Sequence, residues 1–278
     1  MLAKAVRSGA DALSPDLQDS VPAANRTEAR DLTAKWIDAG QQAPVIVRTS
    51  AVKTPDFIKD LEAVVRPGLS GLRLPDVESP EDVVVADQAI STFERERGLA
   101  PNSIVLIPIA ESARGIYRLY DILTASRRVI GTAFPGAEGG DLARDLGVIW
   151  TRQGDEFFYA RSKVLFDARA AGVPIILDSV FANLTDVAGF EQDTRRGRQL
   201  GYTGRLAIHP HQVPVINKIH SPTPEQIEDA QGLLAAYSEA QARGSGAINY
   251  HGRMIDVAMR KTAEALLKQA NFGTNRTR

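Results

Sequence analysis

The sequence contains no cysteine, and this absence removes several kinds of chemistry. None of its 278 residues can form a disulfide, a zinc–thiolate site or a cysteine nucleophile. Freedom from cysteine is also typical of proteins that work in a reducing compartment. We therefore expect a cytoplasmic protein.

An excess of charge of either sign is lacking as well. Lys and Arg number 33, Asp and Glu number 34, and the formal net charge is -1. Binding to nucleic acid or to an anionic membrane depends on a basic excess, so neither partner is predicted. No apolar run approaches the roughly 20 residues that span a bilayer, and residues 1–7 lack the apolar stretch of a signal peptide. A small anionic substrate remains possible, because one arginine or one metal ion is enough to bind it.

What the chain does contain is an alternation of short β-like runs with helix-like stretches, which is typical of a mostly parallel sheet. Several runs are continuously apolar, as expected for strands buried on both faces. The predicted strands are residues 12–17, 45–48, 71–74, 103–109, 129–134, 175–178 and 205–208. The predicted helices between them are residues 26–39, 55–65, 80–97, 113–125, 155–171 and 185–200.

The alternation ends after residue 208. A long helix is predicted over 223–243, followed by a break at 244–246, a short strand over 247–250, a turn at His251-Gly252 and a last helix over 255–270. We therefore predict a catalytic α/β domain over residues 1–221 and a C-terminal helical arm or lid over residues 222–278. The first domain offers seven β/α units, whereas a closed eightfold barrel needs eight strands.

Enzymes on parallel α/β scaffolds carry their active groups at the carboxyl ends of the strands. Carboxylates dominate at these positions, and oxygen ligands without sulfur favour Mg²⁺. An arginine at a strand end is suited to bidentate recognition of a substrate carboxylate. The candidates are Asp16, Asp19, Arg48, Asp76, Glu78, Glu111, Asp141, Asp178 and His209.

Each carboxylate also has a purely structural interpretation, and these alternatives stay open from the residues alone. Asp16, Asp76 and Asp178 sit where a side chain commonly caps the next helix. Glu111 fits a first-turn helix carboxylate, and Asp141, after a glycine-rich stretch, fits a helix cap.

Two further pairs are not predicted to bind a ligand. His209 and His211 lack a third histidine nearby, so a histidine metal site is not predicted. The pair Arg127-Arg128 is interpreted as solvated charge at a helix end.

Several motifs follow one another in a fixed order along the chain. They are VIVR at 45–48, LPDVES at 74–79, IAESARG at 109–115, GDLARDLG at 140–147, IHP at 208–210 and GRMID at 252–256. In this order they resemble the HpcH/HpaI aldolase and citrate lyase β-subunit-like family. The resemblance runs from about Ala5 to about Leu267, and it implies a TIM-type (β/α)8 barrel that here lacks its first strand.

The resemblance also implies site residues. Glu111 and Asp141 would hold Mg²⁺, and Arg48 would act in catalysis by binding the carboxylate of a 2-oxo acid. Backbone amides near Gly139 and Gly140 would help to hold the same ligand.

The last implied residue is Asp256, which belongs to the C-terminal arm. In a homotrimer or hexamer, Asp256 would act as acid or base in the active site of a neighbouring subunit. From the residues alone, a helix N-terminal cap is the preferred interpretation of Asp256.

The implied function is a Mg²⁺-dependent carbon–carbon lyase that cleaves or forms a 3-hydroxyacyl-CoA such as malyl-, citramalyl- or citryl-CoA. Two alternatives remain: a class II aldolase that acts on free 2-oxo acids, and a catalytically impaired homologue that binds CoA esters or 2-oxo acids. Three departures from the family pattern keep the last one open. The initial strand has no counterpart, Gln18 replaces one acidic residue, and Asp76 stands where the family usually has lysine.

Overall fold

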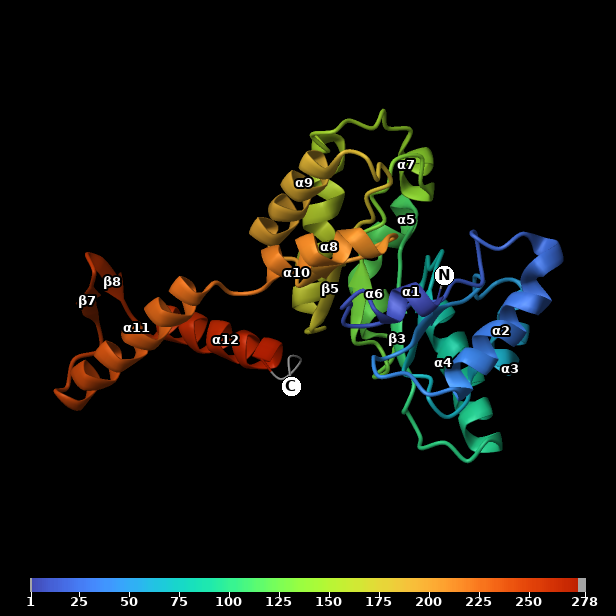
Figure 1. The fold of residues 1–278 in the computed structure, drawn as a ribbon, viewed down its shortest axis with the longest axis horizontal. Coiled ribbons are helices and arrows are strands. Elements are labelled where there is room, and N and C mark those ends of the chain that lie inside the picture. The colour runs from blue at the N-terminus through green and yellow to red at the C-terminus, as the bar shows by residue number, and fades with distance from the viewer. Residues whose placement is uncertain (1, 275–278) are drawn as a thin grey trace. The chain divides into compact units, whose positions relative to one another are not determined.

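The computed structural model describes residues 2–274, and the chain divides into two compact units, Met1–Ile216 and Asn217–Arg278 (Figure 1). The boundary predicted from the sequence lay after residue 221. The helices among residues 2–274 include none with the length and apolar character that crossing a membrane requires.

The first unit consists of short strands, each followed by one or more helices. The strands are β1 (Ile46–Arg48), β2 (Gly71–Leu74), β3 (Val105–Pro108), β4 (Gly131–Ala133), β5 (Ile175–Asp178) and β6 (Gly204–Arg205). The helices are α1 (Leu2–Val6), η1 (Ala23–Asn25), α2 (Arg26–Asp38), α3 (Pro55–Val64), α4 (Pro80–Glu96), α5 (Ala113–Tyr117), α6 (Leu119–Thr124), α7 (Asp141–Leu146), η2 (Asp155–Phe157), α8 (Phe158–Ala170), α9 (Val187–Leu200), η3 (Pro210–Gln212) and α10 (Val213–His220), within which the first unit ends.

The strands pair in parallel and in chain order. They form two three-stranded sheets, β1-β2-β3 and β4-β5-β6, and a parallel bridge between Leu106 and Val129 links β3 to the start of β4. The segment predicted as the first strand runs parallel to β1 but contributes only two isolated bridges, one of which joins Asp16 to Arg48. Pro15 lies between these bridges and has no N–H to donate to a ladder.

Seven parallel strand segments therefore succeed one another, which confirms a parallel α/β fold. No strand pairing within residues 2–274 joins β6 back to the N-terminal segment. Closure into a TIM-type barrel stays a prediction.

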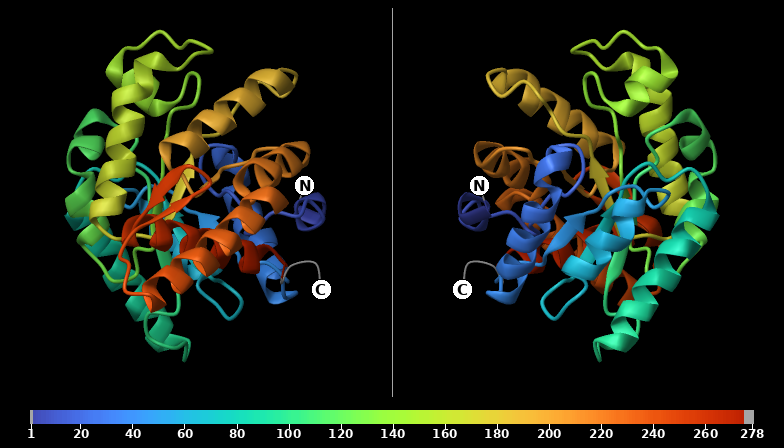
Figure 2. Two further views of the ribbon diagram at one scale, coloured as in Figure 1. Left: turned by 90° about the vertical axis from the view of Figure 1, so that its left-hand side faces the viewer. Right: turned by 90° about the vertical axis from the view of Figure 1, so that its right-hand side faces the viewer.

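The helices of the first unit lie outside the strands, as both views in Figure 2 show for this part of the chain. Neighbouring helices contact each other in the order α2, α3, α4, α6 and α8. One apolar core joins both sheets to this helical layer, and its fully buried members include Val47, Leu72, Leu106 and Ile176. The two sheets are therefore parts of one packed unit.

Helices α3 and α4 begin at Pro55 and Pro80, where the predicted helices 55–65 and 80–97 begin. Helix α4 begins with a capping box between Ser79 and Asp82, and α3 begins with Pro55 after Thr54. The single helix predicted over 113–125 is instead two helices, α5 and α6, divided at Arg118. The short helices α7 and α10 were not predicted, because six to eight residues give too little periodic signal.

The interpretation of Arg128 as solvated charge is wrong. Its side chain is buried and donates to Glu94, which is also buried, and to the half-buried Asp87, whereas Arg127 is exposed as predicted. The pair Arg128–Glu94 joins α4 to the chain entering β4, so Arg128 is a structural residue.

The second unit is built around a helical pair and a hairpin. Helix α11 (Pro224–Ala242) packs on α12 (Val257–Thr274), and the antiparallel strands β7 (Ile248–Tyr250) and β8 (Arg253–Ile255) lie between them in the sequence. Its own small core contains Leu233, Tyr237 and Ile255. His251 and Gly252 form the predicted turn, and both have positive φ angles, as a two-residue hairpin of this kind requires.

Candidate metal centre and active site

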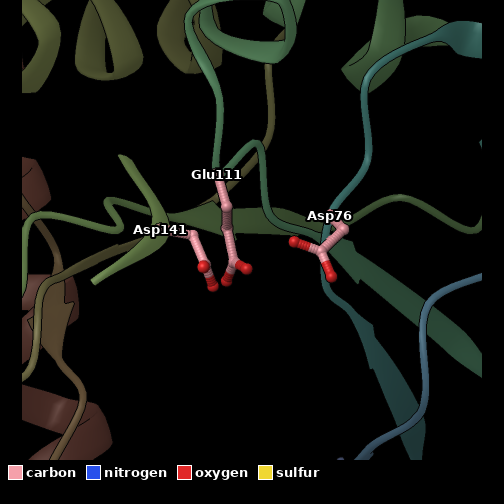
Figure 3. Close-up of side chains that lie close together, drawn as sticks. All are labelled: Asp76, Glu111 and Asp141. Carbon is pink, nitrogen blue, oxygen red and sulfur yellow. The ribbon is translucent and has the colours of Figure 1, made fainter. Parts of the chain in front are cut away.

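Three carboxylates from three successive β-strand ends converge in the first unit. Asp76 follows β2, Glu111 follows β3, and Asp141 begins α7 after β4. One carboxylate oxygen from each lies within 4.8 Å of the others, and Figure 3 shows Glu111 between Asp141 and Asp76. The parallel register brings these carboxyl ends together, as the rule for strand ends predicted.

The geometry of the three carboxylates fits a hard divalent cation. Mg²⁺ binds oxygen at about 2.0–2.1 Å in an octahedral arrangement, so two opposite ligands are roughly 4.2 Å apart. Carboxylate oxygens within 4.8 Å of one another therefore need only small side-chain movements to coordinate such an ion. Among the described residues, this is the one group of carboxylate and histidine ligands close enough to share a cation.

Glu111 is the electrostatic centre of this group. Burial raises the pKa of Glu111 to about 8, and the carboxyl of Asp76 adds to the shift. A carboxyl group with so high a pKa is mostly protonated near neutral pH. A bound cation would stabilise its ionised form. Behind Glu111, Gly115 packs so closely that a Cβ there would lie 2.6 Å from the carbonyl oxygen of Val77. The glycine therefore lets α5 approach β2 and fixes the loop that carries Glu111.

Asp76 was among the strand-end candidates, but the family resemblance did not assign it to the metal. The structure places it beside the two residues that the resemblance did assign. Its φ angle is 53°, a left-handed conformation that aspartate tolerates better than most residues, and Gln18 Nε2 donates to its Oδ2 at 3.1 Å. Its position at a strand end, like that of Glu111, is the signal that made it a candidate.

Arg48 lies at the end of β1, as predicted, but its guanidinium is already engaged. Its Nε and Nη2 donate to the two carboxylate oxygens of Asp16 at 2.7 and 2.6 Å, and Nη1 donates to Asp19 at 3.1 Å. Burial would raise the pKa of Asp16, but the hydrogen bonds and charge of Arg48 outweigh it and lower that pKa to about 2. Asp16 therefore holds Arg48 in place and leaves part of its N–H set for a ligand.

An open pocket of about 510 Å³ adjoins the carboxylates. This volume lies within the range of small-molecule sites. The residues around it are both acidic and basic, and include Lys53, Asp76, Glu78, Glu111, Asp141 and Arg144. A small anion that also binds a metal would find both kinds of partner there.

The glycines of the β4–α7 loop border this region. Gly139 has a φ angle of 67°, which favours glycine, and Gly140 is the N-cap residue of α7. The amide of Gly140 donates to the carbonyl of Ala137 at 3.1 Å, so it closes the loop. The predicted role of these amides in ligand binding stays a prediction.

Three other candidates have structural partners. Asp178 is buried and pairs with Arg161 and Arg205. The Nδ1 of His209 accepts a hydrogen bond from the amide of His211 and caps η3, which agrees with the structural interpretation of that pair. Neither Asp178 nor His209 belongs to the carboxylate group.

Asp256 lies in the second unit, where it performs the capping role left open by the sequence. Its Oδ1 accepts from the amides of Ala258 and Met259 at 2.8 and 3.2 Å, at the start of α12. Its exposed position leaves the second carboxylate oxygen available. The predicted catalytic role of Asp256 stays a prediction.

Comparison with known proteins gives a consistent family. The β subunit of citrate lyase from Leuconostoc mesenteroides subsp. cremoris is 35% identical over 266 residues, which cover 95% of this chain and 86% of that protein. The mitochondrial citramalyl-CoA lyase of Homo sapiens is 31% identical over 258 residues, covering 90% of this chain and 75% of that protein.

A solved relative contains the predicted metal. The crystal structure of protein CitE from Mycobacterium tuberculosis in complex with magnesium, acetoacetate and coenzyme A matches with a TM-score of 0.76 and 28% identity, over 97% of this chain and 92% of that one. The model of the family described as HpcH/HpaI aldolase/citrate lyase matches residues 1–210. The chain therefore belongs to the HpcH/HpaI aldolase/citrate lyase family, which confirms both the family and the lyase class that its ordered motifs predicted.

Proposed function

We propose that this protein is a Mg²⁺-dependent carbon–carbon lyase that cleaves or forms a 3-hydroxyacyl-CoA such as malyl-, citramalyl- or citryl-CoA. The observation that carries the proposal is the convergence of Asp76, Glu111 and Asp141 within 4.8 Å at the carboxyl ends of parallel strands. The names of the relatives, citrate lyase and citramalyl-CoA lyase among them, support the same reaction class.

The reaction is a retro-aldol cleavage. The hydroxyl group of the substrate gives its proton to a base and becomes the carbonyl of a 2-oxo acid. The adjacent carbon–carbon bond breaks, and its electron pair passes to the thioester fragment as an enolate. Protonation of that enolate at carbon gives the methyl or methylene group of the released acyl-CoA, so the two proton transfers balance.

The carboxylates would bind the metal ion, and Arg48 would bind the substrate. Glu111 and Asp141 hold the ion in this proposal, with Asp76 as a third ligand. When bound, Mg²⁺ supplies Lewis-acid stabilisation of the oxygen that becomes the carbonyl. Arg48, oriented by Asp16, donates to the substrate carboxylate, and the Gly139–Gly140 backbone orients the same group.

The acid or base is assigned to Asp256 of a neighbouring subunit in a homotrimer or hexamer. A carboxylate can remove or return a proton at the acyl-CoA methyl group only when it is held close to that carbon. Asp256 is exposed, and its capping bonds use one of its two oxygens. We also propose that the seven strand segments form a TIM-type barrel, which would surround this site.

A second candidate is a binding protein that has lost turnover. Asp76 favours it, because an aspartate bonded to Gln18 adds negative charge where the family usually has lysine. Such a protein would still bind Mg²⁺ together with a 2-oxo acid or a CoA ester.

The test is a cleavage assay on the purified chain. Malyl-CoA, citramalyl-CoA and citryl-CoA are each incubated with protein and Mg²⁺, and release of the 2-oxo acid is followed. Cleavage that EDTA abolishes and Mg²⁺ restores is expected for one of the three. Binding of Mg²⁺ and a 2-oxo acid without any turnover would support the binding protein, and EDTA-insensitive release of a 2-oxo acid would overturn the metal site. Turnover of a free 2-oxo acid aldol without CoA would instead indicate a class II aldolase.

A further inference from the structure

A second arginine shares the face of the first sheet that carries Arg48. Arg73 on β2 lies directly opposite Arg48 on β1 in the parallel register. Directly paired residues of neighbouring strands point to the same face of a sheet. The residues on either side, Leu72 and Leu74, point the other way into the core beneath the helices. Arg73 therefore faces the side of the sheet on which Arg48 meets Asp16.

Within residues 2–274, nothing forms a hydrogen bond or ion pair with the guanidinium of Arg73. Its Nε is buried without a hydrogen-bond acceptor. The buried arginines 30, 128, 161 and 205 all pair with carboxylates. A partly buried cation without a counter-ion is unfavourable, and an anionic ligand would offset that cost.

The surroundings of Arg73 are those of the proposed active site. Arg48, Asp16 and Glu111 are the charged groups that act on it electrostatically. Burial lowers the pKa of Arg73 to about 10, and the charge of Arg48 adds to this, so the side chain remains cationic near neutral pH. The side chain is partly exposed, so a small ligand can reach it.

We propose that Arg73 binds a second carboxylate of the substrate, so that the site takes a 2-oxo dicarboxylate rather than a monocarboxylate. This inference rests on the proposed function. Arg48 and Arg73 leave neighbouring strands that are about 4.8 Å apart, and the carboxyl groups of oxaloacetate are separated by two carbon atoms. Among the three candidate substrates, citryl-CoA releases oxaloacetate, whereas malyl-CoA and citramalyl-CoA release the monocarboxylates glyoxylate and pyruvate.

The test measures how Arg73 changes the choice between 2-oxo acids. Affinities of the full chain with saturating Mg²⁺ are measured by calorimetry for freshly dissolved oxaloacetate, for pyruvate, and for 2-oxobutanoate, which is longer than pyruvate but has one carboxylate. The wild type is expected to prefer oxaloacetate. Arg73→Met should weaken oxaloacetate binding about 10- to 100-fold, the worth of a hydrogen bond between charged groups, and should change the two monocarboxylates by far less. Arg73→Lys should recover part of the preference.

The matched control is Arg127→Met, the same change at an exposed arginine that precedes β4, and it should leave all three affinities unchanged. Thermal melts monitored by circular dichroism check folding, and Arg73→Gln replaces Arg73→Met if the apolar side chain is not tolerated. Equal losses for all three acids would overturn the inference, because Arg73 would then only shape the site. A wild type that binds them without preference would also overturn it but leave the proposed function intact. A wild type that binds none of them with Mg²⁺ would overturn the proposed function, and this inference with it.

Discussion

At the scale of single residues, the site depends on negative charge placed where water cannot fully screen it. Glu111 and Asp141 are half-buried, and Asp76 is partly exposed beside them. Removing one charge from such a group should change metal binding much more than it changes folding, because an ion held by the group would interact with all three oxygens at short range.

Asp141→Asn is expected to weaken Mg²⁺ binding by more than about 100-fold, since loss of a ligand exceeds the effect of losing an outer partner. The fold should persist, because the pair of Asp141 with Arg144 is largely exposed and such pairs contribute little. Calorimetry with Mg²⁺ measures the effect. Glu138→Gln, an exposed carboxylate in the same loop, is the control and should bind the ion normally. Unchanged affinity in Asp141→Asn would remove Asp141 from the metal site.

Mg²⁺ affinity should depend on pH through Glu111. Burial, helped by Asp76, raises its pKa to about 8 in the metal-free protein, so this carboxyl is mostly protonated at about pH 7. Only the carboxylate form binds the ion, so affinity should rise with pH, by up to tenfold per unit, and level off above about pH 8. Calorimetry in buffers of different ionisation enthalpy should detect release of a proton on binding. Asp76→Asn should flatten this dependence, and binding near neutral pH without proton release would contradict the prediction.

At the scale of elements, close packing behind the site fixes its ligands. A Cβ on Gly115 would meet the carbonyl oxygen of Val77 at 2.6 Å and the Cβ of Ala110 at 3.0 Å. Because both contacts involve backbone or short side chains, α5 must move to accept the change. Gly115→Ala should lower the free energy of unfolding by about 1–3 kcal/mol and weaken Mg²⁺ binding. Denaturant unfolding is the measurement, and Gly246→Ala, where no atom lies within 4 Å, is the control.

The buried pair Arg128–Glu94 joins α4 to the chain entering β4. Their side chains are 1% and 2% exposed, so Arg128→Met would leave Glu94 as an uncompensated buried charge. The free energy of unfolding should fall by about 3–5 kcal/mol. Arg95→Met, a neighbouring exposed arginine, should leave stability nearly unchanged in the same denaturation experiment. Equal stability of both variants would mean that the pair contributes little net energy.

At the scale of the whole molecule, the proposed site needs two subunits. Asp256→Ala and Glu111→Ala should each be inactive, and mixed oligomers of the two should recover activity, because some sites would combine an intact metal group with an intact Asp256. Asp256→Asn separates the roles of this residue, since asparagine still caps α12 but cannot act as a base. Assays on hetero-oligomers verified by mass spectrometry provide the measurement. Failure to recover activity would place the acid or base elsewhere.

The sequence determined the order of strands and helices and the positions that follow each strand. Apolar runs and turn residues act locally, so strands such as 71–74 and 175–178 were predicted at their observed bounds. The same local rule placed Glu111 and Asp141 at strand ends. It failed where elements were short, as in α7, and where charge was buried by distant packing, as with Arg128.

Beyond the pair Glu111 and Asp141 that the family resemblance implied, tertiary structure decided which charged groups meet. Asp76, Glu111 and Asp141 are far apart in the sequence, and the parallel register of β2, β3 and the following chain brings their oxygens within 4.8 Å. The same register sets Arg73 opposite Arg48, where its buried Nε finds no acceptor among the described residues. Contacts between these charged side chains depend on pairing between distant segments. Burial in one packed core then sets the strength of their electrostatic interactions. The order of residues therefore nominates candidate ligands, whereas the folded sheet decides which of their oxygens lie close enough to share an ion.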